Sequence, residues 1–463
     1  PQGTLYGRNT IGGAIALYTK KPTQETEGKV KVGFGNEGYN KLAATYSGGI
    51  TDSMVGRIAF STKTDDGFAK EKTSGKNNGG DVDALRLSLI KEMNNGSELS
   101  FTFQDTSYSA DAHLAEAALE CGPTIDPSGS PNFMSVAYFR VGAAASQLAG
   151  AGINPTDCYI TGHLLPFFPA GPLAGQVNAN ALPLIGSDLV QNLVLADVAD
   201  GPRIIDNDHP GFNEIDSTLI SLKYVSDISD TLTLTAMLST TDVENESSLD
   251  FDATSRASIV NYVVDESDQT STEIRLNYSG DRFNWVGGIY LLDDNIYSHY
   301  NFTTDIQSTF GIVQIMQMMA GLTPSPSDNA QTSNADVTSE AIYWQGTYAI
   351  TDKLNATLGV RKSDDESDYT IEMTTTSPGI PFVQVPGKWS EVLEFGSTDP
   401  KLVLDYSFNE NTMGYVSVSS GYKSGGFSFA TWSESESRGG FNEEELDATE
   451  IGVKYKSSDN RLV

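Results

Sequence analysis

The sequence is poor in cysteine, in basic residues and in long apolar runs. Two cysteines among 463 residues are too few for a disulfide-built scaffold or a four-cysteine zinc site. Lysine and arginine total 29 against 61 aspartates and glutamates, which gives a net charge of −32. Such a chain has no basic surface with which to neutralise the phosphates of a nucleic acid, so we expect no nucleic-acid partner. No stretch approaches about 18 consecutive apolar residues, which excludes a transmembrane helix.

What the sequence does contain is a repeated alternation of apolar and polar residues. In the segment 231–238 the apolar side chains Leu232, Leu234, Ala236 and Leu238 fall at every second position, with threonines between them. Successive side chains of a strand point to opposite faces, so each such segment has one apolar and one polar face. We predict about 14 strands of about 7 to 12 residues each. Their expected spans are 29–35, 39–47, 53–64, 82–91, 97–107, 216–226, 230–241, 270–279, 282–293, 340–350, 353–363, 400–408, 411–421 and 448–456.

The connections between these strands alternate in length. From the second strand onward, turns of a few residues alternate with the long segments 65–81, 108–215, 242–269, 294–339, 364–399 and 422–447. In an antiparallel meander this places all tight turns at one end and all long loops at the other. Together with alternating polarity, that asymmetry predicts an all-β transmembrane antiparallel β-barrel. A soluble β-sandwich also alternates in polarity, but it does not require the long loops to share one end.

The first 22 residues differ from the rest, being rich in glycine and closed by a proline. They contain Leu5-Tyr6-Gly7, then Gly12-Gly13-Ala14-Ile15, then Thr19-Lys20-Lys21-Pro22. This order resembles the end of the plug domain in TonB-dependent outer-membrane receptors. The segments 271–276, 421–427 and 450–454 are similar to barrel strands of the same family. The resemblance implies a plug remnant over residues 1–24 and a partial barrel over 25–463, whose largest extracellular loop is 108–215.

The family barrel has 22 strands around a plugged lumen, of which about 14 are expected in this chain. The chain begins at Pro1 in mid-pattern, and a further strand is expected after Val463, so we interpret it as a fragment. The resemblance implies active transport of a scarce ligand, an iron–siderophore complex by family frequency, across the outer membrane of a Gram-negative bacterium. Partners would be the TonB energy-coupling complex, reached through a segment preceding Pro1, together with the ligand, outer-membrane lipids and lipopolysaccharide.

Other functions stay open at this point. Cobalamin, haem or oligosaccharide could be the ligand within the same family. A passive porin-like pore or a surface adhesin is an alternative of another class, although neither needs a plug-like segment. A β-rich hydrolase would need a convergent catalytic set, and no spacing singles one out. We therefore expect no enzyme activity, no cofactor and no metal site.

Few residues stand out as functional candidates. Arg8 is the charge of interest in the plug remnant, because a cation inside the lumen needs a carboxylate partner. Glu273 and Glu450 lie on the polar faces of their strands, and we predict that Arg8 contacts one or both. Alternatively, these glutamates pair with Arg275 and Lys454, which are their neighbours in sequence, or meet water.

The remaining candidates lie in the segment 108–215. Cys121 and Cys158, with 36 residues between them, are predicted to form a disulfide because exported proteins pass an oxidising compartment. Tyr159, Phe167 and Phe168 could form an aromatic ligand patch, or pack the loop against itself. All four histidines fall in predicted long loops. Of these, His113 is a candidate metal or haem ligand that has no second ligand at useful spacing.

Overall fold

The computed structural model describes residues 3–71, 75, 77–111, 204–205, 209, 211–250, 259–304, 327–376, 385–428 and 434–457. Nearly all of its regular structure is β-strand. The helices are α1 (Gly3–Tyr6) and α5 (Glu434–Ser437). The strands are β1 (Glu27–Phe34), β2 (Asn40–Thr51), β3 (Met54–Asp65), β4 (Lys70–Glu71), β5 (Gly80–Glu92), β6 (Glu98–Ala110), β7 (Ile204–Ile205), β8 (Phe212–Ser229), β9 (Leu232–Asp250), β10 (Ile259–Ser279), β11 (Phe283–Thr304), β12 (Ser327–Ala349), β13 (Leu354–Thr375), β14 (Gly387–Asn409), β15 (Thr412–Lys423) and β16 (Glu444–Tyr455).

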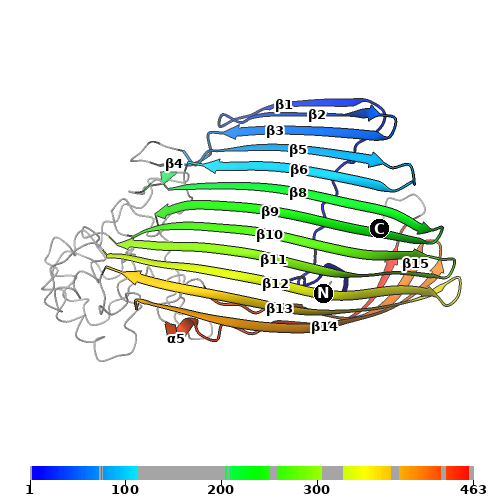
Figure 1. Cartoon of the computed structure of the whole chain (residues 1–463). Helices are drawn as coiled ribbons and strands as arrows, with labels where there is room; N and C mark the ends of the chain where they lie inside the picture. Colours follow the sequence, from blue (N-terminus) through cyan, green and yellow to red (C-terminus); the bar gives the residue numbers. More distant parts are fainter. Residues whose placement is uncertain are drawn as a thin grey trace, which may run out of the picture.

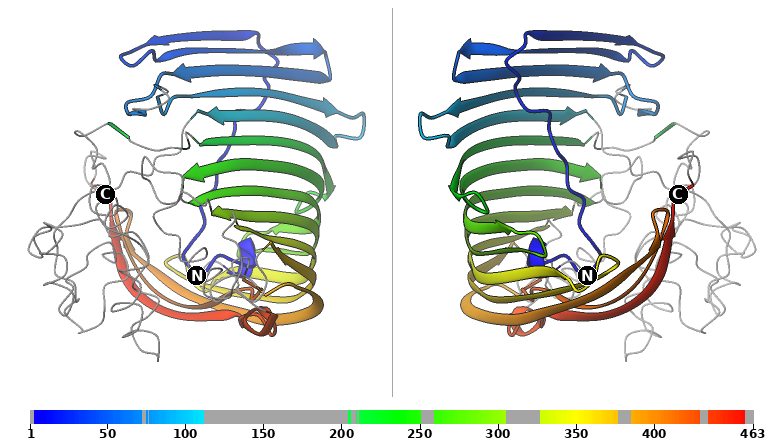
Figure 2. Two further views of the ribbon diagram at one scale, coloured as in Figure 1. Left: turned by 90° about the vertical axis from the view of Figure 1, so that its left-hand side faces the viewer. Right: turned by 90° about the vertical axis from the view of Figure 1, so that its right-hand side faces the viewer.

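Fourteen of these strands form a single antiparallel sheet, which confirms the predicted number and fold class. The sheet order is β1-β2-β3-β5-β6-β8-β9-β10-β11-β12-β13-β14-β15-β16, so each strand lies beside its neighbour in sequence. The two short strands β4 and β7 form a separate parallel pair. The large sheet curves into an open trough, with β1 along one edge and β16 along the other (Figures 1 and 2). Among the described residues, no helix has both the length and the apolar character needed to cross a bilayer.

The tight turns lie together at one end of the trough, as predicted (Figure 1). Each of them joins two strands across two to five residues, as in β5 to β6 and β8 to β9. Their local chemistry is that of turns: Gly96 has a positive φ of 80°, and the amide of Ser97 donates to the Asn95 side chain. The antiparallel connectivity places the other connections at the opposite end.

The convex face carries an apolar belt near the turn end. The ladder places Tyr46, Ile58, Leu87, Phe103 and Ile220 opposite one another on five successive strands. Large apolar side chains on this face are exposed across the whole width of the sheet, from Val30 on β1 to Val453 on β16. The aromatic rings of Tyr278, Phe283, Trp285 and Trp344 cluster beside the turns. A lipid-facing band flanked by aromatic residues is what a transmembrane barrel requires.

The central strands are longer than predicted. Strands β8 to β14 contain 18 to 23 residues, and they continue through parts of the expected loops 242–269, 294–339 and 364–399. At about 3.3 Å per residue, such strands are more than twice as long as an apolar band of about 25 Å. Their outer halves therefore stand beyond the belt, where the convex face loses its apolar alternation. The segment expected as loop 422–447 is also shorter, because β16 begins at Glu444.

The N-terminal segment lies inside the trough. Figure 2 shows residues 3–24 crossing the concave side from the lower wall to the edge at β1. Its first part, α1, contacts β12, β13, β14 and β15. Its last part meets β2, where the amide of Thr23 donates to Ser47 at 3.0 Å. The chain thus spans the hollow of its own sheet.

Candidate functional site

Helix α1 rests on the inner wall through close backbone contacts. The hydroxyl of Thr4 donates to the carbonyl oxygen of Asp399 at 3.3 Å, and Thr4 is 2% exposed. A Cβ atom at Gly3 would lie 3.1 Å from the Cα of Gly421, which is closer than almost all real contacts of a Cβ atom. A side chain at position 3 would require one of the two backbones to shift by a few tenths of an ångström.

The residues after α1 anchor the segment to β15. Gly7 has a φ of 83° and its amide donates to the carbonyl of Gly3 at 3.0 Å, which ends the helix. Asn9, also with a positive φ, donates its amide to the carbonyl of Tyr422 at 3.1 Å. The side-chain oxygen of Asn9 accepts the amide of Ser424, also at 3.1 Å. This reciprocal pair fixes the register of the segment on the wall.

A buried carboxylate holds the cation of the segment. Arg8 Nη1 lies 3.9 Å from Asp365 Oδ2, and the same oxygen accepts the hydroxyl of Tyr422 at 2.9 Å. The Asp365 side chain is only 2% exposed. Its other oxygen, Oδ1, has no hydrogen-bond partner within the described residues. Removing either partner would therefore leave a poorly solvated charge.

A second cation of the wall lies directly under the segment. The guanidinium of Arg361 is 5.6 Å from the ring centroids of both Tyr290 and Tyr343, and the ladder places Asp399 opposite Arg361. A Cβ atom on Gly7 would lie 3.0 Å from Arg361 Nη2, so the backbone of the segment touches the guanidinium. Two aromatic faces hold this planar cation in one orientation. We call the following residues the inner-wall seat: Arg361, Asp365, Asp399 and Tyr422.

The predicted partners of Arg8 lie elsewhere on the concave face. Glu273 accepts the hydroxyl of Tyr343 and lies 3.9 Å from Arg275 Nη1. Among the described residues, the ion pair of Arg8 is with Asp365 rather than with Glu273. The structure thus places a cation of the segment against a carboxylate of the wall, but on a different strand.

Glu450 is also engaged locally. It accepts the hydroxyl of Tyr415, its neighbour on β15, and the Lys454 ammonium lies 5.2 Å from the centroid of the Tyr415 ring. Because β16 is an edge of the sheet, Glu450 and Lys454 are exposed. The structure does not bring Glu450 and Arg8 together.

An aromatic cluster occupies the concave face beyond the belt. It comprises Ala335, Tyr369, Ile371, Met373, Trp389 and Phe427. The rings of Tyr369 and Phe427 stack with centroids 4.0 Å apart. The indole of Trp389 donates to Ser437 Oγ at 3.0 Å, which joins the cluster to α5. We call this group the outer aromatic cluster.

Two hydrogen bonds to one carboxylate complete this contact. Glu391 Oε2 accepts the amide of Gly439 at 2.9 Å and the hydroxyl of Tyr369 at 3.0 Å. These donors, the amide first, lower the pKa of Glu391. Burial, reinforced by the hydrogen bond to Glu391, raises the pKa of Tyr369 to about 12. The carboxylate therefore stays ionised and the phenol stays protonated at neutral pH.

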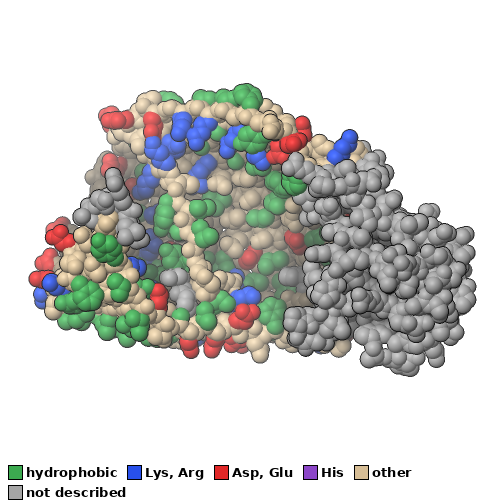
Figure 3. Space-filling view, turned by 180° about the vertical axis from the view of Figure 1, so that it is seen from behind, with side chains coloured by type: hydrophobic (Ala, Val, Ile, Leu, Met, Phe, Trp, Pro, Cys, Tyr) green, Lys and Arg blue, Asp and Glu red, His purple; other side chains and the backbone are tan. Residues whose placement is uncertain are grey.

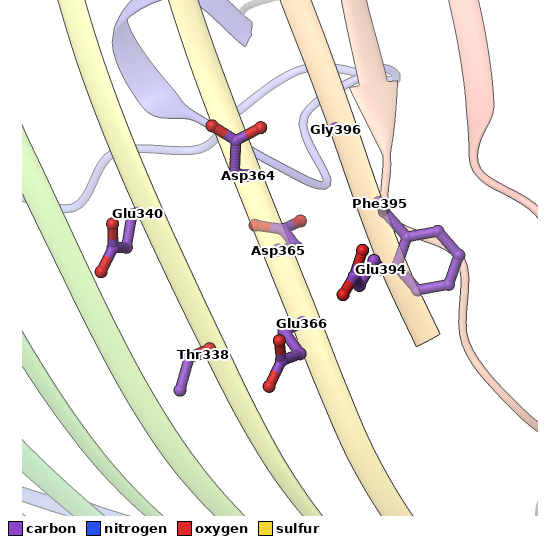
Figure 4. Close-up of a pocket in the computed structure, with 8 residues that line it drawn as sticks. All are labelled: Thr338, Glu340, Asp364, Asp365, Glu366, Glu394, Phe395 and Gly396. Atoms are coloured by element: carbon purple, nitrogen blue, oxygen red, sulfur yellow. The ribbon is translucent and has the colours of Figure 1, made fainter. Parts of the chain in front are cut away.

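A cavity of about 500 Å³ lies among acidic side chains of β12, β13 and β14 (Figure 4). Glu340, Asp364, Glu366 and Glu394 line it, at alternate positions that continue the convex face beyond the belt. Within the described part of the chain, no group of three histidine, cysteine or acidic residues has an arrangement that could hold a metal ion. The lining side chains make this cavity an acidic groove on the outer halves of the three strands.

Several predicted residues lie outside the described residues: His113, Cys121, Cys158, Tyr159, Phe167 and Phe168. The disulfide and the aromatic ligand patch accordingly stay predictions. The prediction that all histidines lie in long loops is wrong for His299, which lies in β11 with Nδ1 3.0 Å from Thr332 Oγ1. His209 contacts Ser248 Oγ at 2.7 Å.

The seat was only partly visible in the sequence. Arg361 falls on the predicted polar face of a strand, but Asp365 falls in a segment expected to be a loop. The available signal was the spacing of Arg361, Ser363 and Asp365 at every second position. It continues the inner face of the predicted strand 353–363 past its expected end.

Comparisons with known proteins agree with this architecture. The sequence model of the family described as TonB dependent receptor-like, beta-barrel matches residues 171–462. Two vitamin B12 transporters named BtuB match short stretches. The one from Photobacterium profundum is 34% identical over 71 residues, which is 15% of this chain and 12% of the relative. The one from Vibrio vulnificus is 29% identical over 103 residues, 22% of this chain and 17% of the relative.

Solved structures share the fold at low sequence identity. The ferric yersiniabactin uptake receptor FyuA from Yersinia pestis superposes with a TM-score of 0.68 at 16% identity, over 99% of this chain and 56% of its own. The siderophore receptor PiuA from Acinetobacter baumannii gives 0.64 at 13% identity, over 99% of this chain and 58% of its own. The chain thus spans less than two thirds of the proteins that it resembles. Because the family model matches well over half of its residues, the chain belongs to the TonB-dependent receptor β-barrel family.

Proposed function

We propose that this protein takes part in TonB-dependent active transport of an iron–siderophore complex across the outer membrane of a Gram-negative bacterium. The family is one of outer-membrane transport receptors and not an enzyme family. The observation that carries the proposal is the segment 3–10, held inside the curve of the sheet by the inner-wall seat. A passive pore has no need of such an obstruction.

We assign residues 1–24 to the end of a plug domain and residues 25–463 to the barrel. The support for this division is a change in structure near Glu27. Before that residue the chain crosses the hollow, and from it onward the chain forms the wall (Figure 2). The exposed apolar belt supports a position of the wall in lipid.

Energy for transport would come from the TonB complex, which is the partner that gives the family its name. The inner-wall seat explains why energy is needed. Its buried ion pair, backbone hydrogen bonds and glycine contacts must all be broken before the segment can move. Lipids and lipopolysaccharide would surround the convex face.

A second ligand, cobalamin, is favoured by one observation. The matching stretches of the two BtuB proteins belong to vitamin B12 transporters, and at 34% and 29% identity they exceed the identities of the solved siderophore receptors. These matches cover at most 22% of the chain. The iron complex therefore stays the first proposal.

Uptake by whole cells that carry the gene separates these possibilities. Under iron limitation, cells should accumulate ⁵⁵Fe supplied as a siderophore complex, and a protonophore should abolish the accumulation. Uptake of ⁵⁷Co-cobalamin in place of ⁵⁵Fe would assign the second ligand. Entry of either probe that persists after the proton gradient collapses would contradict active transport and indicate a passive pore.

A further inference from the structure

Carboxylates gather on the convex face of the central strands, beyond the apolar belt. We call the following six residues the acidic band: Asp216, Glu244, Glu266, Asp293, Glu366 and Glu394. They lie on β8, β9, β10, β11, β13 and β14, and all of them are exposed. Strand β12 contributes Glu340 to the same face, in the acidic groove of Figure 4. The band thus crosses the middle of the sheet.

The ladder fixes the face on which the band lies. A row of directly opposed residues leads from Ile220 on β8 to Asp293 on β11. The same row continues across β12 to Glu366 and Glu394. Directly opposed residues share a face of the sheet, so these carboxylates point outward, as the exposed Ile220 of the belt does.

The belt also fixes the height of the band. On β8, Asp216 lies four residues from Ile220 on the same face. For a tilted strand, this separation places the carboxylate about 10 Å beyond the belt along the membrane normal. Lipid headgroups follow the hydrocarbon at this height. The band is therefore continuous with the lipid-facing surface and lies beside the headgroups.

Basic side chains lie on the other face of the same strands. In β8 to β12 the lysines and arginines are Lys223 and Arg275. The ladder places Lys223 in one row with Glu273, and Arg275 is two residues from that glutamate, so both point into the trough. Figure 3 shows further basic side chains, in blue, on the inner wall beneath the first strands. Within the described residues, no lysine or arginine lies at ion-pair distance from the six carboxylates.

Carboxylates of the band also oppose one another directly. Glu244 lies opposite both Asp216 and Glu266. Glu366 lies opposite Glu394. Like charges in these positions destabilise a sheet. Cations bound between the strands would offset this repulsion.

The band lies away from the edges and from the hollow of the sheet. Strands β8 to β14 each have a paired neighbour on both sides. The N-terminal segment crosses the concave face, which is the opposite side of the wall (Figure 2). Further strands would extend the edges at β1 and β16, and further parts of a plug would occupy the trough. The surface of the band is thus left to the membrane.

The carboxylates do not form a metal site by themselves. Among the residues that the structure describes, no group of three acidic, histidine or cysteine side chains is arranged to hold a metal ion. Mg²⁺ is commonly held by one or two carboxylates together with phosphate oxygens and water. Opposed pairs such as Glu366 and Glu394 provide the carboxylates. Headgroups at the same height can provide the phosphates.

We propose that the acidic band binds phosphorylated glycolipids of the outer leaflet through bridging divalent cations. Each cation joins carboxylates of neighbouring strands to a headgroup phosphate. Without the cation the two surfaces repel each other, because both are negative. This inference rests on the proposed outer-membrane function, which places the band beside the lipid, and it is independent of the cargo.

The test compares two quadruple variants of the full-length folded protein in neutral detergent. In the band variant, glutamine replaces Glu244, Glu266, Glu366 and Glu394. In the control variant, the corresponding amides replace Asp52, Asp230, Asp281 and Glu410. Both variants lose four negative charges, but the control residues are exposed in the tight turns at the opposite end of the strands. The probes are lipid A, which is a phosphorylated glycolipid, and its dephosphorylated form.

We expect Mg²⁺ to strengthen the binding of lipid A to the wild type about tenfold or more relative to EDTA. The band variant should lose this enhancement. In EDTA it should bind lipid A more tightly than the wild type does, because fewer carboxylates repel the phosphates. The control variant should behave as the wild type in both conditions. The dephosphorylated lipid should bind all three proteins equally, with or without Mg²⁺.

Equal enhancement by Mg²⁺ in all three proteins, or none in the wild type, would overturn the proposal. Binding of Mn²⁺ to the wild type as tightly without lipid A as with it would also overturn it, because the protein alone would then hold the cation. Cells that import neither ⁵⁵Fe nor cobalamin would contradict the transport function and leave these binding results unchanged. The two failures are therefore distinguishable.

Discussion

At the scale of single residues, Asp365 connects the two parts of the structure. It accepts the hydroxyl of Tyr422 from the wall and pairs with Arg8 from the crossing segment. A buried carboxylate with one unpartnered oxygen is costly to desolvate, so it is stabilising only while both partners are present. The attachment of the segment therefore depends strongly on this one charge.

Asp365→Asn should loosen the segment without removing the acceptor that Tyr422 uses. We expect a loss of about 1 to 3 kcal/mol, because the partly buried guanidinium of Arg8 loses the carboxylate 3.9 Å away and is left without a charge partner. The measurement is the rate at which a maleimide labels Thr4→Cys, a position that is 2% exposed when the segment is seated. Labelling should be about tenfold faster or more in the Asp365 variant.

The matched control is Asp364→Asn, the neighbouring carboxylate on the opposite face of β13. It removes the same charge but touches neither Arg8 nor Tyr422, so labelling should stay at the wild-type rate. Cys121 and Cys158 are replaced by serine in all of these proteins. Equal acceleration by both variants would mean that overall charge, and not the seat, holds the segment.

The sequence was informative about the type of contact and not about the partner. A carboxylate partner for Arg8 could be expected because a largely buried cation is costly without one, and that argument uses only charge and burial. The choice among Glu273, Glu450 and Asp365 depends on which strands meet the segment. Sequence spacing does not fix that choice, because each of these carboxylates lies on the inner face of a different strand.

At the scale of elements, each central strand has two halves with different surroundings. Near the turns the convex face is apolar, as at Ile274, Ile289 and Ile342, which lie opposite one another on β10, β11 and β12. Farther along the same strands, the convex face is polar and the concave face carries the outer aromatic cluster. In the half near the turns, contact with lipid requires apolar residues on the convex face. In the half beyond the belt, the strands are held together by continuation of the hydrogen-bonded ladder.

Ile289→Arg should disrupt insertion of the barrel. Ile289 lies in the apolar belt between two isoleucines, and an arginine there costs about 2 to 4 kcal/mol at the middle of the bilayer. Asn295→Arg, on the same face of β11 but beyond the belt, should cost about 0 to 1 kcal/mol. Urea titration of the protein folded in lipid vesicles measures both. Equal costs would contradict the position of the belt.

This division also explains which strand boundaries could be predicted. The turn ends were predicted well, because apolar alternation stops at short polar turns such as 280–282. The outer ends were not, because a strand exposed to water on its convex face has no apolar period. Tyr369, Ile371 and Met373 repeat at every second position on β13, but they follow a run of acidic residues that favours a loop.

At the scale of the whole molecule, the structure is a curved wall with part of the same chain inside it. The convex face is apolar around the belt, and the concave face carries the inner-wall seat and the outer aromatic cluster. Transport through such a molecule requires the inner segment to move relative to the wall. Movement of residues 3–10 is therefore the central requirement of the proposed transport.

A reversible crosslink between α1 and β13 tests that mobility most directly. A Cβ atom on Gly359 would lie 2.7 Å from Thr4 Cγ2, so cysteines at these two positions are close enough for a disulfide. In cells whose receptor has serine at positions 121 and 158, we predict that the oxidised Thr4→Cys/Gly359→Cys protein binds its ferric chelate but imports none. A reductant should restore uptake, and each single cysteine variant should transport under both conditions. Undiminished uptake by the fully crosslinked protein would contradict the account.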